Sequence, residues 1–214
     1  MKLAILGATG GTGLCLVQQA LDEGHEVVAI MRNTSNYSID HEKLKVVNGD
    51  IFSVDSLVSH FKGCDVVMSC LGTRTWFYVT IYSDTINVII EATRKAGISR
   101  FIVVTSWCTS DNPKDRGPFL MEWVFKTTFL RSVLRDMAKQ EQVIGSCSDI
   151  NYSVVRPPLL TDEPVTDKEF KTEIDRLHVP GVGYSKIPRA DVARFMLKCL
   201  KTDKYDRKMV AISL

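Results

Sequence analysis

Leu3-Ala4-Ile5-Leu6-Gly7-Ala8-Thr9-Gly10-Gly11-Thr12-Gly13, close to the start of the chain, is the stretch that decides the fold. Its apolar half predicts a buried strand, and the residues after the glycines have helical periodicity up to Gly24. A second apolar run over 26–31 predicts another strand. A strand, a glycine-rich turn, a helix and a second strand together indicate a unit with two parallel strands.

Three glycines in a GxxGxxG pattern have mechanical roles that suit a dinucleotide. Gly7 allows the tight turn, Gly10 lets the backbone approach a pyrophosphate, and Gly13 lets the helix pack closely on the sheet. The pyrophosphate would lie at the helix N-terminus, where free amides and the helix dipole favour negative charge. The pattern alone is weak, but its position between two strands makes it a specific indication.

The residue that ends the second strand indicates which dinucleotide is bound. NAD-binding units usually place an Asp or Glu there for the ribose 2′-hydroxyl, whereas an Arg accepts a 2′-phosphate. This chain has Arg32, and the loop 33–36 contains no acidic residue. We therefore predict NADP(H) as the cofactor. The alternative is that Arg32 is only a solvated surface residue.

Length and composition limit the function classes. The 214 residues, 45% of them hydrophobic, match one domain with one substantial core. The net charge of +2 comes from scattered residues, so we expect no nucleic-acid or membrane-surface binding. We expect no signal peptide, because Met1 and Lys2 lead straight into the first strand, and no membrane span of ~20 apolar residues. Six cysteines without CxxC pairs predict reduced thiols, a cytoplasmic location and no metal site.

Strands and helices alternate to the C-terminus, which predicts an α/β protein with a doubly wound parallel sheet (a Rossmann fold) in a single domain over 1–214. Further strands are expected at 44–48, 65–70, 101–106, 152–155 and 209–213, and further helices at 53–61, 80–96, 119–142 and 189–200. The segment at about 159–188 is expected to be irregular and to lie on the substrate side. Trp123, Phe125 and Phe129 have helical spacing and are expected in the core.

Ligands of such sheets bind beyond the carboxyl ends of the strands, so the residues just after each strand are candidates for contact. Asp50 either accepts a hydrogen bond from the adenine amino group or is an ordinary turn residue. Gly72 gives the backbone room beside a ribose and nicotinamide, and Thr73 or Arg74 could reach the phosphates. Ser106 follows the next strand of the chain.

Aromatic residues gather after two neighbouring strands. Trp76, Phe77 and Tyr78 lie in a predicted loop, and Trp107 follows the strand after it. Large flat ligands favour aromatic surfaces through offset stacking. Three adjacent aromatics in a loop cannot all point inward, so we expect a ligand or partner surface here; packing in the core is the alternative.

These residues resemble the atypical short-chain dehydrogenase/reductase family, with its NAD(P)H-binding Rossmann fold, and most closely its flavin reductase or biliverdin-IXβ reductase type. The resemblance spans nearly the whole chain and rests on the segments 4–13, 49–50, 71–74, 105–106, 157–158 and 195–206. It implies an NADPH-dependent reductase of flavins and linear tetrapyrroles, with an open substrate site over the nicotinamide. The cofactor contacts that it implies are Thr9, Gly10, Thr12, Arg32, Asp50, Leu71, Gly72 and Arg74. Together with Gly7, Gly11, Gly13, Thr73 and Pro157, these form the predicted cofactor site.

Two departures from the family pattern bear on catalysis. The flavin reductase type has a His after the proline pair, near the substrate, and this chain has Leu159 there. The broader family uses a Tyr with a Lys four residues later, and no such pair occurs on the predicted helix. A flat acceptor stacked on the nicotinamide can still receive hydride directly and take its proton from water. We therefore predict Ser106 as the catalytic residue, orienting water or acceptor, and Trp76, Trp107 and Leu159 as substrate-binding residues; the alternative is that Ser106 only caps a strand end.

Three function classes remain open. The first is a monomeric NADPH-dependent reductase of a small flat substrate such as a flavin or biliverdin. The second is a non-catalytic NADP(H)-binding redox sensor that signals through a protein partner. The third is an isomerase, cyclase or specialised-metabolite reductase on the same scaffold, with Leu159 and the aromatic loop shaping an apolar pocket.

Overall fold

One sheet of eight strands forms the centre of the protein in this computed structural model, which describes residues 1–119, 121–128 and 130–214. The strand order is β3-β2-β1-β4-β5-β6-β10-β8. All neighbouring strands are parallel except β8, which runs antiparallel to β10. The strands are β1 (Lys2–Leu6), β2 (Glu26–Met31), β3 (Leu44–Asn48), β4 (Val66–Ser69), β5 (Arg100–Val104), β6 (Asn151–Arg156), β8 (Lys171–Ile174) and β10 (Lys208–Ser213).

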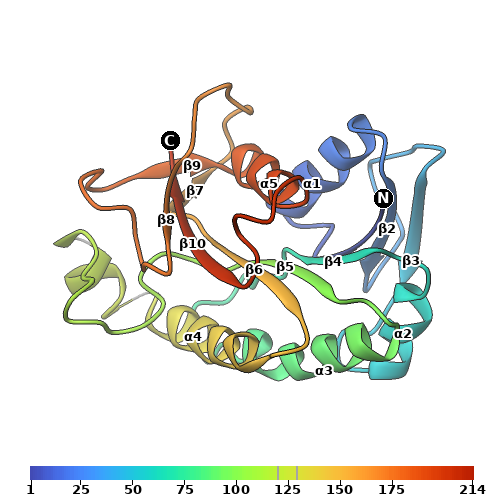
Figure 1. Ribbon diagram of the computed structural model, residues 1–214, viewed down its shortest axis with the longest axis horizontal. Coiled ribbons are helices and arrows are strands. Elements are labelled where there is room, and N and C mark those ends of the chain that lie inside the picture. Colours follow the sequence, from blue (N-terminus) through green and yellow to red (C-terminus); the bar gives the residue numbers. More distant parts are fainter. Residues whose placement is uncertain (120, 129) are drawn as a thin grey trace.

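Helices cover both faces of the sheet, as Figure 1 shows. Helices α1 (Gly11–Asp22) and α5 (Arg189–Lys198) pack together on one face, and α2 (Val54–Phe61), α3 (Ile81–Lys95) and α4 (Arg131–Ser146) lie on the other. Each face has its own apolar core, because the central strands are buried on both sides and alternate their side chains between the two layers. The predicted doubly wound Rossmann fold is confirmed.

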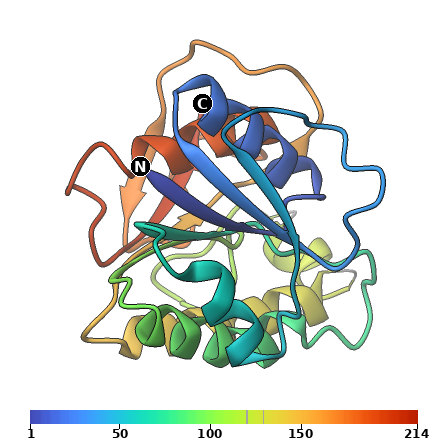
Figure 2. The same cartoon turned by 90° about the vertical axis from the view of Figure 1, so that its right-hand side faces the viewer.

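The chain changes direction across the sheet between β1 and β4. From β1 it moves outward to β2 and β3, then returns to β4 on the other side of β1 and continues to β5 and β6. A crevice outside the carboxyl ends of the strands is expected at such a reversal. In Figure 2 the arrows of the first strands point toward the right, and the loops that follow them gather on that side.

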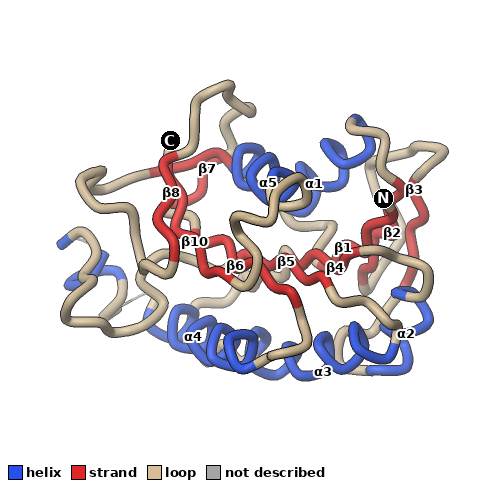
Figure 3. Tube along the Cα trace, in the orientation of Figure 1, coloured by secondary structure: helices blue, strands red, loops and turns tan. Residues whose placement is uncertain are grey.

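The helix predicted over 119–142 is wrong in its first half. A short π-helical turn, η1 (Met121–Phe125), precedes α4, which begins only at Arg131 and continues to Ser146, and residues 126–128 between them form a turn (Figure 3). The hydroxyls of Thr127 and Thr128 donate to the carbonyls of Trp123 (2.8 Å) and Val124 (2.6 Å). Such local bonds compete with regular helical bonding.

The prediction that Trp123 lies in the core is also wrong, because its side chain is 58% exposed. Phe129 and the side chain of Phe125, which were expected beside it, lie outside what the structure describes.

The segment predicted to be irregular, at about 159–188, contains three short strands. Besides β8 these are β7 (Leu159–Thr161) and β9 (Lys186–Pro188), which pair with each other in parallel. Sequence periodicity does not predict these strands, because each has only three or four residues, too few for a period to register. The pairing of β7 with β9 aligns the end of β7 at Thr161 with Pro188, directly before the start of α5.

Candidate functional site

The glycine loop between β1 and α1 has no room for side chains at two of its positions. Gly7 has φ +75°, and a Cβ atom on it would lie 2.4 Å from the carbonyl oxygen of Cys70. A Cβ atom on Gly13 would lie 2.1 Å from the carbonyl oxygen of Gly7. At Gly10 the nearest atom would be 3.4 Å away, so the loop is open there. This matches the roles that the sequence predicts for a tight turn, a close helix and an approachable backbone.

The N-terminus of α1 is left without a side-chain cap. Its N-cap residue is Gly10, and its first turn has no acidic residue. By contrast, α2 is capped by Ser53 and has Asp55 in its first turn, while α3 and α5 have Asp84 and Asp191. The amides in the first turn of α1 therefore remain available to an anion, and the helix dipole favours one at this end.

Arg32 lies directly after β2, with an exposed side chain that forms no ion pair with any residue that the structure describes. Its carbonyl accepts a hydrogen bond from the side-chain amide of Asn48 at the end of β3 (2.6 Å). In the loop beyond it, the hydroxyl of Tyr37 donates to the carbonyl of Ala8 in the glycine loop (3.3 Å). Burial raises the pKa of Tyr37 to about 12, so it stays a neutral donor. These two bonds fix the backbone of Arg32 at the end of β2 and connect the following loop to the glycine loop.

Asp50 is engaged in local turn structure. One of its carboxylate oxygens accepts a hydrogen bond from the amide of Phe52 (2.9 Å), and its own amide donates to the hydroxyl of Ser56 (3.0 Å). The turn explanation that the sequence left open therefore applies. The other carboxylate oxygen accepts no hydrogen bond from any residue that the structure describes, and the exposed side chain can accept a further bond there.

The loop after β4 starts beside the glycine loop. Leu71 is half-buried, and a Cβ atom on Gly72 would meet nothing within 4 Å, so the backbone here borders open space. The hydroxyl of Thr73 is used within the loop, 2.9 Å from that of Thr75, whereas Arg74 is exposed. Trp76 is 54% exposed, as expected of a ligand surface.

Helix α4 holds the far end of this loop. The hydroxyl of Ser132 accepts a hydrogen bond from the amide of Val79 (2.8 Å). The carboxylate of Asp136, which is buried, accepts bonds from the amides of Tyr82 (2.9 Å) and Ser83 (3.2 Å) and from the Ser83 hydroxyl. Asp136 thus caps α3 from a neighbouring helix, because α3 has no cap of its own.

A buried ion pair fixes the ends of β5 and β6. Arg156, at the end of β6, forms a bidentate pair with Glu141 on α4, with contacts of 3.0 and 2.7 Å. The hydroxyls of Thr105 and Thr109 each donate to the same carboxylate at 2.7 Å. Both residues are at least 95% buried. The backbone on either side of Ser106 is therefore anchored, which leaves the half-buried Ser106 at a defined place beyond β5.

Trp107 is buried, contrary to the prediction that it offers a stacking surface. Its side chain is 1% exposed and packs with Cys108, Val179 and Ala211. Leu159, which replaces the family His, packs against the same group and is half-buried. Pro157 is buried, and its carbonyl accepts a hydrogen bond from the amide of Trp107 (2.9 Å). Of the three predicted substrate-binding residues, Trp76 is the one that is largely exposed in this structure.

Sequence reasoning missed Asp136 and Glu141. Both lie on the inward face of α4 together with Leu134, Met137 and Ile144. The available signal was an acidic residue at a position where the helical period demands an apolar one. Carboxylates are seldom buried without partners, so such a position indicates a network whose other members are far away in the sequence.

The two cysteines that flank the expected site have no nucleophilic character. Burial raises the pKa of the Cys70 thiol and that of the Cys108 thiol to about 12 each. A nucleophilic cysteine needs a lowered pKa. We therefore assign neither a catalytic role.

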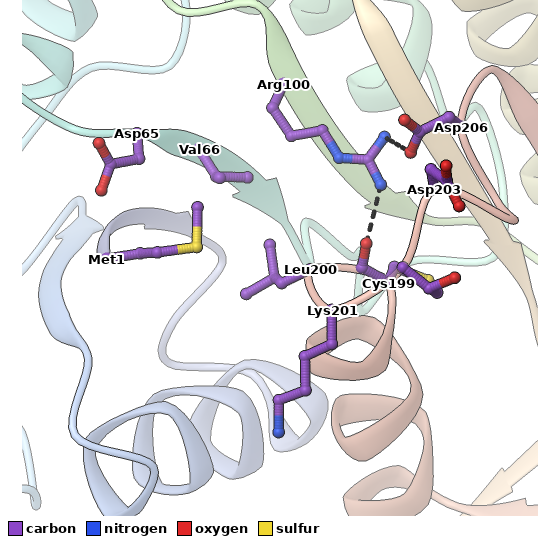
Figure 4. Close-up of a pocket in the computed structure, with 10 residues that line it drawn as sticks. Met1, Asp65, Val66, Arg100, Cys199, Leu200, Lys201, Asp203 and Asp206 are labelled. Carbon is purple, nitrogen blue, oxygen red and sulfur yellow. Dashed lines mark hydrogen bonds and ion pairs between the residues drawn. The ribbon is translucent and has the colours of Figure 1, made fainter.

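A hollow of about 380 Å³ lies at the opposite edge of the sheet, beside the amino ends of β1, β4 and β5 (Figure 4). Arg100 crosses it, donating to the carbonyl of Cys199 (2.9 Å) and pairing with Asp206 (3.0 Å). These contacts engage the Arg100 guanidinium, and the hollow lies away from the edge where ligands of such sheets bind. We do not assign it a ligand.

Residues 7–203 match the model of a family described as NAD(P)H-binding. The chain belongs to this NAD(P)H-binding family. Among curated relatives, the photosystem II assembly factor Ycf39 of Synechocystis is 24% identical over 217 residues; the match covers 97% of this chain and 61% of that protein.

Two solved structures of similar fold cover all of this chain. A candidate NADH-flavin reductase of Streptococcus pneumoniae has a TM-score of 0.80 at 22% identity, over 99% of its own chain. A short-chain dehydrogenase/reductase of Veillonella parvula in complex with NADP has a TM-score of 0.79 at 18% identity, over 94% of its own chain. At these identities the likeness bears on the fold. In the part of the chain that the structure describes, no helix has the length and apolar content needed to cross a membrane.

Proposed function

We propose that this chain is an NADPH-dependent reductase that transfers hydride to a flat conjugated acceptor, such as a flavin or a linear tetrapyrrole. The observation that carries the proposal is the position of Arg32, exposed and without an ion-pair partner among the described residues, beside an α1 N-terminus that has neither cap nor acidic residue. The N-terminus of α1 favours the diphosphate of a dinucleotide, and Arg32 favours an additional 2′-phosphate.

The described residues fit such a cofactor. The glycine loop is closed where a side chain would collide and open at Gly10, where the pyrophosphate would approach. Arg32 would bind the 2′-phosphate, Asp50 has a carboxylate oxygen for the adenine amino group, and Gly72 leaves space beside the ribose. When bound, NADPH would supply the hydride. The complex of the Veillonella parvula neighbour with NADP supports this choice.

The chemistry left to the protein is positioning. Asp136 and Glu141 on α4 are already used for capping and for the ion pair with Arg156, so this helix offers no proton donor from these positions. An acceptor that takes its proton from water needs none. Ser106 orients that water or the acceptor, and Trp76 with Leu159 provides apolar contact for a flat ring system.

Binding and turnover test the proposal together. We expect NADPH to bind at least ten times more tightly than NADH, measured by fluorescence titration, because charge-assisted hydrogen bonds contribute about 1.5–3 kcal/mol. Arg32→Glu should remove that preference by weakening NADPH binding alone. Lys139→Glu, an equal charge change at an exposed position of α4, is the control and should leave it intact. Equal affinity of the wild-type protein for both cofactors would refute the NADP assignment.

Turnover with flavin mononucleotide and with biliverdin decides whether the site is catalytic. A second candidate function, an NADP(H)-binding sensor without catalysis, is favoured by the absence of a Tyr–Lys pair on α4 and by the replacement of the family His with Leu159. The name of the relative Ycf39, an assembly factor, is in line with it. Tight NADPH binding without oxidation by any flat acceptor would support the sensor and contradict the reductase.

A further inference from the structure

The glycine-loop pattern does not explain why position 11 is a glycine. The pattern uses Gly7, Gly10 and Gly13, and the position of Gly11 is free in it. In this structure a Cβ atom on Gly11 would lie 2.6 Å from Cδ and 3.1 Å from Nε of Arg189. The flexible side chain of Arg189 thus lies beside the first residue of α1, in the space into which a Cβ atom at position 11 would project.

Arg189 reaches this place because α1 and α5 pack side by side on the same face of the sheet (Figure 1). It is the first residue of α5, and β9 immediately precedes it. Its guanidinium is 30% exposed and pairs with Asp162 at 2.5 Å. Asp162 follows β7, the partner of β9, and its carboxylate oxygen lies 3.8 Å from the Cβ position of Gly11.

Arg189 and Asp162 have opposite effects on anion binding at the N-terminus of α1. A carboxylate next to a helix N-terminus competes with a bound anion, and two anions side by side repel each other. A guanidinium next to the same N-terminus would add to the attraction for phosphate oxygens. The Asp162 side chain is 87% exposed, and exposed ion pairs contribute little to stability, so Arg189 can leave this partner at low cost.

We propose that Arg189 is a phosphate-binding residue that exchanges Asp162 for the diphosphate of the bound dinucleotide. The inference rests on the proposed function, since it concerns the same cofactor, and adds a residue from α5 to a site otherwise built from the first half of the chain. Asp162 then acts as a competitor that keeps the guanidinium in place beside Gly11 until the diphosphate arrives.

The exchange predicts opposite effects for the two partners. Arg189→Met should weaken NADPH binding about tenfold or more, because a charge-assisted contact to phosphate is lost. Asp162→Asn should strengthen NADPH binding about two- to fivefold, because the competing pair of an exposed carboxylate is removed. A purely structural ion pair would give changes of the same sign for both variants, since either substitution breaks it.

Titration with two ligands locates the effect at the diphosphate. NADPH contains both the 2′-phosphate and the diphosphate, whereas adenosine 2′-monophosphate contains only the phosphate assigned to Arg32. Arg189→Met should weaken the binding of NADPH and leave the affinity for adenosine 2′-monophosphate unchanged. The control is Arg94→Met, which breaks a comparable exposed pair with Asp149 (2.6 Å) at the C-terminal end of α3 and should change neither affinity.

The outcomes separate this inference from the proposed function. If the wild-type protein binds NADPH and Arg189→Met binds it equally well, the role of Arg189 is refuted while the cofactor assignment stands. A loss of both ligands in Arg189→Met, or weaker NADPH binding in Asp162→Asn, also refutes it. If the wild-type protein binds no NADPH, the proposed function itself fails. Thermal melting of each variant confirms that the fold is intact before affinities are compared.

Discussion

The buried ion pair of Glu141 and Arg156 tests what holds α4 to the ends of β5 and β6. Glu141→Gln leaves the amide able to serve Thr105 and Thr109, one as acceptor and one as donor, but removes the charge that balances Arg156. Breaking a buried pair by removing one partner costs about 3–5 kcal/mol, because the other charge remains in the protein interior.

The corresponding shift in melting temperature is large for a chain of this size. At about 2–4 °C per kcal/mol, Glu141→Gln should melt roughly 6–20 °C below the wild-type protein. Adding Arg156→Met removes the unbalanced charge, so the double variant should be more stable than Glu141→Gln alone. Urea unfolding followed by circular dichroism measures both free energies of unfolding.

An exposed pair on α3 serves as the control. Glu91→Gln breaks its 2.9 Å pair with Lys95, in which both side chains are about half exposed, and should cost no more than about 0.5 kcal/mol. The reasoning is refuted if Glu141→Gln costs as little as Glu91→Gln. It is refuted equally if Arg156→Met destabilises the protein further on top of Glu141→Gln.

Three further predictions concern the glycine loop, the α3 cap and the thiols. Gly13→Ala should destabilise the protein by about 1–3 kcal/mol in urea unfolding, because its Cβ atom would lie 2.1 Å from a backbone carbonyl oxygen. The control is Gly145→Ala in α4, whose Cβ atom would lie 3.3 Å from the flexible side chain of Met209 and should not destabilise the protein. Asp136→Ala should cost about 0.5–2 kcal/mol and speed amide hydrogen exchange at the start of α3; unchanged exchange there would contradict its capping role. With pKa values of about 12, Cys70 and Cys108 should react with iodoacetamide at pH 8 on the order of a hundred times more slowly than in urea-unfolded protein, and rapid native labelling followed by mass spectrometry would contradict this.

The cofactor half of the fold was predictable because its determinants are local. The strand, turn and helix over 2–22 follow from an apolar run and three glycines, and the structure confirms the collisions that make Gly7 and Gly13 necessary. Arg32 was found by its distance along the chain from the glycines alone. Each of these signals lies within about thirty residues, so no tertiary contact had to be known.

The region after β5 and along α4 depends on contacts between distant segments, and there the sequence predicted less. Trp107 follows a strand as expected, but the packing of Val179 and Ala211 against it decides that it is buried. The capping role of Asp136 depends on Tyr82 and its neighbour, more than fifty residues away. Nothing in the local sequence specifies these partners.

Helix α4 has a consequence for how such a protein can diversify. Ser132 and Asp136 hold the loop after β4, and Glu141 holds the ends of β5 and β6, so one helix fixes the segments on both sides of Ser106. The dinucleotide half rests instead on α1. If the proposed function holds, substitutions near the start of α4 should alter acceptor selectivity without changing dinucleotide affinity, so the two traits are separable in evolution and in engineering.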